Sequence, residues 1–185
     1  LKVAIQGVGH VGLGLARHLK QAGAELWVCD IFDANVRQAM EELGANAVRP
    51  HDIYGLDVDV FAPCAMGGIL NAETLQTLRA PVIAGAANNQ LASPEIGAEL
   101  QRRNHLYAPD YAINAGGIID VYYQRVGGSA AQSDAHIRGI AETLREIFER
   151  AASSGESTSI VADRLAQERL GGVHAVPQQP QRLQA

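Results

Sequence analysis

Three glycines near the start of the chain constrain its fold more than any other feature. Gly7, Gly9 and Gly12 form a G-x-G-x-x-G pattern, which follows an apolar run over residues 3–6 and opens a helical pattern over 11–22. In such a strand–turn–helix context the first glycine permits a tight turn. The second lets a pyrophosphate approach backbone N–H groups, and the third lets the helix pack close to the strand. The pattern therefore predicts a dinucleotide-binding turn, with a purely structural glycine turn as the alternative.

Short apolar runs and helical patterns alternate through the first two thirds of the chain. We expect further strands over residues 26–29, 47–48, 59–63, 81–84 and 106–108, and helices over 34–43, 73–78 and from Ser93 onward. Such alternation is typical of βαβ units that build a parallel sheet. The sequence therefore predicts an α/β fold, a Rossmann-type doubly wound parallel sheet with helices on both faces.

Helical patterns alone follow residue 110, and we expect helices over 111–126, 135–152 and 160–170. The second of these carries its apolar residues on one face. The expected organisation is a Rossmann domain over 1–132, C-terminal helices over 133–170 that pack on it, and a tail over 171–185. Prolines and glutamines are frequent in the tail, and that composition predicts disorder.

Charge and cysteine content argue against several kinds of partner. The formal net charge is −5, which gives no electrostatic reason to expect a nucleic acid. No apolar run approaches the roughly 18 residues that would span a bilayer, so no membrane partner is expected. Cys29 and Cys64 both lie in apolar, strand-like runs. We therefore expect buried reduced thiols in a cytoplasmic protein, and no metal site.

Asp30 ends the strand expected over residues 26–29. A carboxylate at that position accepts hydrogen bonds from the adenosine ribose hydroxyls and repels a 2′-phosphate. Ile31 follows it, and no arginine is at hand to neutralise such a phosphate. The residues favour NAD over NADP as cofactor, with a surface aspartate as the alternative. His10 and Val11 fill the variable positions of the turn and are counted with the cofactor site, although His10 is given no chemical role.

Small and polar residues follow other expected strand ends, at residues 64–68 and 85–90. Ligands bind at the carboxyl ends of strands in open α/β sheets, so these segments are expected to lie against the cofactor. Asn114 stands beside two glycines after the last strand. Its amide suits a nicotinamide carboxamide or a substrate carboxylate, because it donates and accepts at once. Structural glycine turns and a helix cap at Asn114 are the alternatives.

Taken together, these segments resemble the C-terminal domain of the leucine/phenylalanine/valine dehydrogenase family, relatives of glutamate dehydrogenase. The resemblance runs from Val3 to about Leu170. It rests on the glycine pattern and on the segments at residues 52–54, 62–68, 86–91, 107–117 and 162–164. The family catalyses reversible oxidative deamination of an L-amino acid to a 2-oxo acid, with NAD as hydride acceptor. The resemblance implies such a dehydrogenase for a branched-chain or aromatic amino acid and leaves the particular substrate open.

The resemblance also implies roles for individual residues. Cys64 and Ala65 match the segment that lies along the cofactor, and Ala87 is counted with the same site. Asn89 matches the asparagine that faces the substrate carboxylate and the nicotinamide end. Ile118 and Val121 match positions that line the side-chain pocket. Their branched shapes suit an apolar substrate, and apolar helix packing explains them equally well.

No residue of this chain is assigned a catalytic role. In the family the catalytic lysines and aspartate lie in a separate N-terminal domain, and the lysines of this sequence are Lys2 and Lys20. Deamination needs a group that activates water, often a lysine with a depressed pKa. We therefore expect this chain alone to be inactive.

The expected partners are an amino acid or 2-oxo acid, an N-terminal catalytic domain of the same protein and, at full length, other copies in a homo-oligomer. Three alternatives remain open at this stage: a glutamate-dehydrogenase-like enzyme, another Rossmann oxidoreductase, and a non-catalytic NAD-sensing module.

Overall fold

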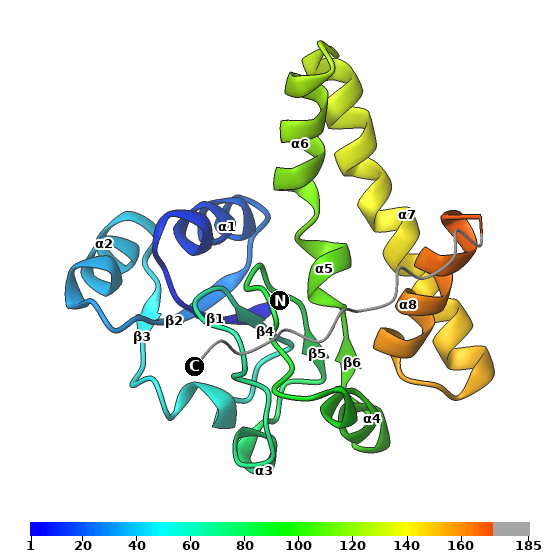
Figure 1. The fold of residues 1–185 in the computed structure, drawn as a ribbon. Helices are drawn as coiled ribbons and strands as arrows, with labels where there is room; N and C mark the ends of the chain where they lie inside the picture. The colour runs from blue at the N-terminus through cyan, green and yellow to red at the C-terminus, as the bar shows by residue number, and fades with distance from the viewer. Residues whose placement is uncertain (172–185) are drawn as a thin grey trace, which may run out of the picture.

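The computed structural model describes residues 1–171, and its centre is a six-stranded parallel sheet (Figure 1). The strands are β1 (Lys2–Gln6), β2 (Glu25–Cys29), β3 (Asn46–Ala47), β4 (Val60–Pro63), β5 (Val82–Ile83) and β6 (Leu106–Tyr107). Their order is β3-β2-β1-β4-β5-β6, and every neighbouring pair is parallel. This is the Rossmann strand order, in which the winding direction reverses between β1 and β4. The predicted fold class is confirmed.

Helices cover both faces of the sheet. Helices α1 (His10–Gln21) and α2 (Asp33–Leu43) lie on one side, while α3 (Thr74–Thr77), α4 (Pro94–Arg102) and a short 3₁₀ turn at Ile53–Gly55 lie on the other (Figure 1). Two separate hydrophobic clusters correspond to the two faces. Side chains alternate along β4, so Phe61 belongs to the α3–α4 face and Ala62 to the α1–α2 face.

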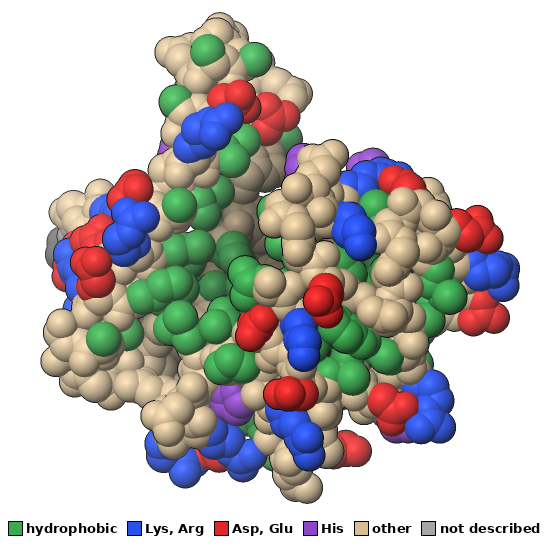
Figure 2. All heavy atoms as spheres, turned by 180° about the vertical axis from the view of Figure 1, so that it is seen from behind, with side chains coloured by type: hydrophobic (Ala, Val, Ile, Leu, Met, Phe, Trp, Pro, Cys, Tyr) green, Lys and Arg blue, Asp and Glu red, His purple; other side chains and the backbone are tan. Residues whose placement is uncertain are grey.

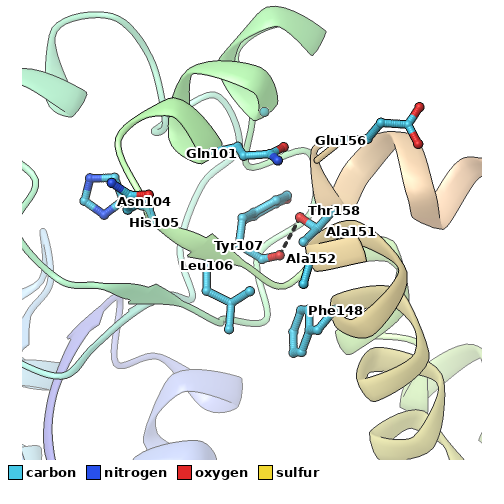
Figure 3. Close-up of a pocket in the computed structure, with 11 residues that line it drawn as sticks. Gln101, Asn104, His105, Leu106, Tyr107, Phe148, Ala151, Ala152, Glu156 and Thr158 are labelled. Carbon is cyan, nitrogen blue, oxygen red and sulfur yellow. Dashed lines mark hydrogen bonds between the residues drawn. The ribbon is translucent and has the colours of Figure 1, made fainter. Parts of the chain in front are cut away.

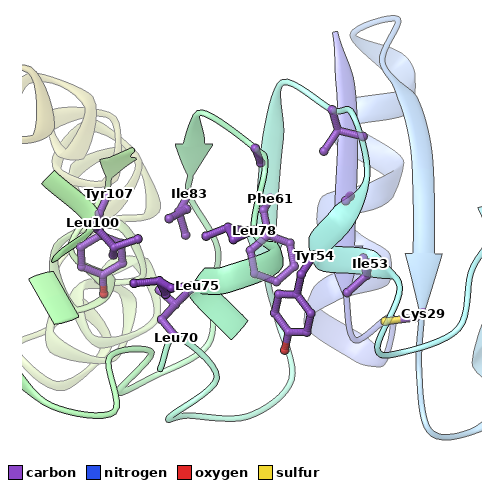
Figure 4. Packing of buried hydrophobic residues seen from close by; sticks show 13 residues of the cluster. Cys29, Ile53, Tyr54, Phe61, Leu70, Leu75, Leu78, Ile83, Leu100 and Tyr107 are labelled. Carbon is purple, nitrogen blue, oxygen red and sulfur yellow. The ribbon is translucent and has the colours of Figure 1, made fainter. Parts of the chain in front are cut away.

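Phe61 lies near the centre of the larger cluster, which Figure 4 shows from close by. It is fully buried, and its ring packs at 5.2 Å, centroid to centroid, against the tilted ring of Tyr54. Leu75 and Leu100 bring α3 and α4 onto the same cluster. Apolar side chains of α3, α4 and the strands thus cover this face of the sheet.

The C-terminal part of the chain consists of α5 (Asp110–Ile113), α6 (Gly116–Arg125), α7 (Ala130–Ser154) and α8 (Thr158–Arg169). The single helix expected over 111–126 is wrong, because two helices replace it. Asn114 caps the C-terminus of α5, and its side chain donates to Asn88 Oδ1 at 2.6 Å. Ala115 follows, and Gly116 and Gly117, which disfavour a helix interior, form the first two positions of α6. The helices α6 and α7 then form an arm that projects beyond the sheet (Figure 1).

Helix α7 begins at Ala130, five residues before the expected start at 135. A capping box sets this start: Ser129 Oγ accepts from Gln132 N at 3.3 Å, and Gln132 Oε1 accepts from Ser129 N at 2.9 Å. The expected domain boundary between 132 and 133 therefore falls inside the first turn of α7. The division into domains stays a prediction, and the tail from 172 to 185 lies outside the described residues.

The capping box makes a testable contribution to stability. Replacing Ser129 by alanine is expected to lower the free energy of unfolding by about 1 kcal/mol, because the N–H of Gln132 loses its side-chain acceptor. Ser153→Ala is the matched control, since Ser153 lies exposed in the last turn of α7 and alanine is a better helix former. Urea unfolding measures both variants. Equal stability of Ser129→Ala and the parent chain would contradict the assignment.

Candidate functional site

The candidate site lies at the carboxyl edge of the sheet, where β1 leads into the glycine turn. Backbone hydrogen bonds fasten this turn to both neighbouring strands: Gly7 N donates to Cys29 O at 2.8 Å, and Cys64 N donates to Gln6 O at 2.7 Å. The turn therefore bridges the ends of β2 and β4. This is the topological switch point at which ligands bind in open α/β sheets.

The three glycines of the turn differ in backbone conformation and in the space available for a Cβ. Gly7 has φ +92°, and a Cβ added there would lie 2.6 Å from Ala65 Cβ. A Cβ at Gly12 would lie 1.9 Å from Gly7 O. At Gly9, in contrast, a Cβ would meet no atom within 4 Å. Gly7 and Gly12 are thus required by packing, whereas the fold alone does not require Gly9.

The open space at Gly9 stands at the N-terminus of α1. Gly9 is the N-cap of this helix, and no side chain caps it. The first N–H groups of a helix have no partner inside the helix, and with the helix dipole they form a site for an anion. His10 and Val11 are exposed in this first turn. The geometry is suited to a diphosphate.

Asp30 lies directly beside this turn and has a structural role that the sequence did not predict. Its Oδ2 accepts from Val8 N at 2.8 Å, and its Oδ1 accepts from Phe32 N at 2.9 Å. The carboxylate therefore holds the glycine turn against the end of β2. Each carboxylate oxygen has a second lone pair, so hydroxyl donors can still bind there.

A cavity of about 140 Å³ opens between Asp30 and the turn, and it is lined by Gln6, Gly7, Cys29, Asp30, Ile31, Pro50, Ala65, Met66 and Ile69. Sequence reasoning missed Gln6. Its Nε2 donates to Tyr54 Oη at 2.8 Å, while its buried Oε1 has no partner among the described residues. A polar residue at the end of an apolar strand, directly before the glycine turn, was the available signal. Gln6 therefore brings a buried amide with one unused acceptor next to this cavity.

A second and larger cavity of about 930 Å³ lies between the loop after β5 and the helices α5, α6 and α8. Asn89, Asn114 and Ile118 line it. Asn114 Nδ2 donates to Asn88 Oδ1 at 2.6 Å, so the amide fastens α5 to this loop. Asp110 does the same through its carboxylate, which accepts from Asn89 N at 2.6 Å. Sequence reasoning also missed Asp110.

Three other predicted residues, Val121, Cys64 and Ala87, line neither of these two cavities. Ile118 and Val121 stand on α6, with 74% and 60% of their surfaces exposed. Cys64 packs behind the turn, where a Cβ at Gly12 would lie 3.2 Å from it. Ala87 is buried, and its N–H donates to Pro63 O at 2.9 Å. Ala87 therefore offers little surface to a ligand, and its role remains a prediction.

The thiols and lysines are poorly placed for chemistry at this edge. Burial raises the pKa of the Cys29 thiol to about 11, and burial also raises the pKa of Cys64. Both are therefore neutral thiols near pH 7. Lys2 begins β1 and Lys20 lies in the last turn of α1, so both belong to the opposite edge of the sheet. Residues 1–171 contain no group of three or more His, Cys, Asp or Glu that could hold a metal ion.

A further cavity of about 240 Å³ lies between α4, β6 and the α7–α8 pair (Figure 3). Two of its lining residues are joined by a hydrogen bond, in which Thr158 Oγ1 donates to Tyr107 O at 2.7 Å. Phe148 and Leu106 face its apolar part, whereas His105 and Glu156 point away on opposite sides (Figure 3). These polar groups do not converge, so this cavity is not the candidate site.

Figure 2 shows the side of the molecule opposite to Figure 1. Apolar side chains gather there in a hollow below the α6–α7 arm, and charged side chains lie around and directly beside this hollow (Figure 2). None of the helices within the described residues is long and apolar enough to cross a membrane.

The strand order and the glycine turn define a Rossmann-type nucleotide-binding domain. The sequence profile of the Glutamate/Leucine/Phenylalanine/Valine dehydrogenase family matches residues 30–167. The chain belongs to this family. The match begins at Asp30, so the glycine turn is independent support for the fold and not part of the profile match.

Individual relatives agree with the family assignment. The chain is 45% identical over 171 residues to L-tryptophan dehydrogenase of Nostoc punctiforme, covering 92% of this chain and 48% of that protein. It is 46% identical over 168 residues to leucine dehydrogenase of Geobacillus stearothermophilus, covering 91% and 46%. The crystal structure of L-tryptophan dehydrogenase from Nostoc punctiforme superposes with a TM-score of 0.90 at 44% identity, covering 92% of this chain and 51% of that one. The chain thus spans about half the length of the relatives it matches.

Proposed function

We propose that the chain is the NAD-binding domain of an L-amino-acid dehydrogenase, an oxidoreductase for reversible oxidative deamination of a branched-chain or aromatic L-amino acid to the 2-oxo acid. The observation that carries the proposal is the open glycine turn at the N-terminus of α1, with Asp30 beside it. Family membership supports the reaction class. The identity of 46% to a leucine dehydrogenase and 41% to a phenylalanine dehydrogenase supports the substrate class.

The residues at the carboxyl edge fit a dinucleotide. The N–H groups at the start of α1 would hold the diphosphate, with the empty space at Gly9 admitting it. Asp30 would accept from ribose hydroxyls, in a cavity that Gln6 also lines. When bound, NAD supplies the hydride acceptor. Asn89 and Asn114 would orient the nicotinamide end and the substrate, beside Ile118, which lines the same cavity. Val121 is exposed on the same helix and would add to this apolar surface.

A test of cofactor choice is the Asp30→Ala variant, with NAD and NADP titrated separately by calorimetry. We expect NAD affinity to fall by about 10- to 100-fold, because charge-assisted ribose bonds and the Val8 anchor are lost. Loss of the Val8 anchor weakens the binding of both cofactors, but we expect NADP affinity to fall much less than NAD affinity or to rise, because the carboxylate no longer repels the 2′-phosphate. Asp33→Ala is the matched control, an exposed carboxylate at the start of α2. Parallel losses for NAD and NADP would argue against the proposed role of Asp30.

The complete reaction is proposed to need the part of the protein beyond this chain. Lys2 and Lys20 lie at the edge opposite the site, so the water-activating groups would come from an N-terminal catalytic domain. The helices over 133–170 would reach toward it. We propose that the purified chain binds NAD without turning over an amino acid, and NADH formation by it would overturn this point.

We also propose an oligomeric assembly and a cytoplasmic location for the full-length protein. A hetero-hexameric glutamate dehydrogenase from Thermus thermophilus matches with a TM-score of 0.70 at 25% identity, which supports an oligomer at full length. Its lower identity also favours an apolar substrate over glutamate. The buried Cys29 supports a reducing, cytoplasmic location.

A further inference from the structure

We propose that Asp110 is a positioning residue, whose buried carboxylate holds Asn89 in the backbone conformation that presents its side chain to the nicotinamide end of NAD. The inference rests on the proposed function, because it assigns a task to Asn89 there. It concerns a residue to which neither the sequence pattern nor the comparisons give a role.

The first support is the bonding of the carboxylate. Asp110 begins α5, and only 9% of its surface is exposed. Its Oδ2 accepts from Asn89 N at 2.6 Å, and its Oδ1 accepts from Tyr107 Oη at 2.8 Å. No cation pairs with Asp110 within residues 1–171, so these donors stabilise the buried charge. Hydrogen bonds to a charged group are about twice as strong as neutral ones.

The second support is the conformation of Asn89. Its φ is +52°, in the left-handed region that residues other than glycine rarely adopt. Asparagine tolerates this region better than most other residues, and a hydrogen-bond partner for its N–H helps to keep the backbone there. The bond from Asn89 N to Asp110 supplies such a partner, and it joins residues 21 positions apart in the sequence.

The third support is that the loop after β5, which carries Asn89, is also tightly packed on the side away from Asp110. Gly68 N donates to Asn89 O at 2.7 Å, and a Cβ at Gly67 would lie 2.8 Å from Asn88 O. The loop after β5 is therefore held between the loop after β4 and α5. Without the bond to Asp110, the peptide group that carries the Asn89 N–H could rotate. The Asn89 side chain would then change its direction as well.

Asp110 acts through Asn89 in this account. Both residues line the cavity of about 930 Å³, where Asn89 is exposed while Asp110 is buried. The two oxygens of Asp110 are directed at Asn89 N and Tyr107 Oη. A ligand in the cavity therefore meets the Asn89 side chain first.

The experiment compares Asp110→Ala and Asp110→Asn in this chain, using NAD and ADP-ribose, which lacks the nicotinamide. For Asp110→Ala we expect NAD affinity to fall by about tenfold, with ADP-ribose affinity changed by less than about twofold. Asp110→Asn should retain most NAD affinity, because its amide oxygen still accepts from Asn89 N and its NH₂ group donates to Tyr107 Oη. A merely structural role would not separate the two ligands.

Asp163→Ala is the matched control, because Asp163 lines the same cavity and bonds to Tyr111 Oη and not to the loop. It should bind both ligands as the parent chain does. Should Asp110→Ala fail to fold, Asp110→Ser, which keeps a polar group near Tyr107 and is too short to reach Asn89, takes its place. Unchanged NAD affinity in the folded variant, or equal losses for NAD and ADP-ribose, would overturn the inference.

Amide hydrogen exchange at Asn89 separates this inference from the proposed function. We expect faster exchange at Asn89 N–H in Asp110→Ala, because the bond that protects it is gone. If the parent chain binds neither ligand, the proposed function fails. In that case unchanged exchange at Asn89 would also overturn the positioning role, whereas faster exchange would support the contact between Asp110 and Asn89.

Discussion

Replacing Gly9 by alanine is expected to abolish NAD binding while lowering the melting temperature by only a few degrees, about what a poorer N-cap residue costs. The new Cβ meets no atom within 4 Å in the chain itself, and the backbone there, with φ −69° and ψ −158°, is extended and accessible to alanine. The methyl group would instead occupy the space through which a pyrophosphate approaches the N–H groups of α1. We expect a loss of at least about 100-fold in affinity, which corresponds to roughly 2.7 kcal/mol.

Gly14→Ala is the control for this prediction. Gly14 also has open space around an added Cβ, but it lies within α1, past the first turn. Alanine there should raise stability by up to about 1 kcal/mol through helix propensity and leave NAD affinity unaltered. Calorimetric titration and thermal melting of both variants provide the comparison. Binding by Gly9→Ala at the level of the parent chain would contradict a diphosphate site at this turn.

Replacing Gly12 by alanine is expected to destabilise the fold itself. A Cβ at this position would lie 1.9 Å from Gly7 O and 2.9 Å from Gly7 C, and backbone atoms cannot move aside as a flexible side chain can. The helix α1 would have to shift away from the turn that β1 leads into. Overpacking of this kind commonly costs about 1–3 kcal/mol and sometimes more, and a backbone clash belongs at the upper end. The total free energy of unfolding of a domain is only about 5–15 kcal/mol, so this loss is large.

Urea unfolding measures this second effect directly. The Gly12→Ala midpoint should fall well below that of the parent chain, with a similar slope, because the surface exposed on unfolding is the same. NAD affinity should fall as well, since the helix N-terminus moves. The pair of variants separates two roles: Gly9→Ala loses binding but little stability, and Gly12→Ala loses both. An unchanged midpoint for Gly12→Ala would show that α1 does not pack against the turn as described.

The fold could be predicted from the sequence because its signals are local. The glycine turn, the apolar runs of β1, β2 and β4, and the helical periods between them each fall within a few neighbouring residues. The start of α7 was predicted five residues late because its apolar pattern begins only at Ile137. The Ser129–Gln132 capping box was a readable signal for the true start.

The site could be predicted only in part. Asp30 was placed beside the glycine turn, since both follow strand ends at the same edge of the sheet. Its bond to Val8 N, the unpaired Oε1 of Gln6 and the bond from Asn89 to Asp110 depend on tertiary approach between distant segments. No pattern of neighbouring residues encodes such contacts.

The most direct test of the central claim is a titration of the ¹⁵N-labelled chain with NAD, followed by nuclear magnetic resonance. The account predicts that the backbone amides of residues 7–12 show the largest shifts, followed by those of Asp30 and Ile31, because the diphosphate and the adenosine ribose would bind there. Shifts confined to the cavity around Phe148 and Thr158, or no shifts at saturating NAD, would contradict a dinucleotide site at the N-terminus of α1.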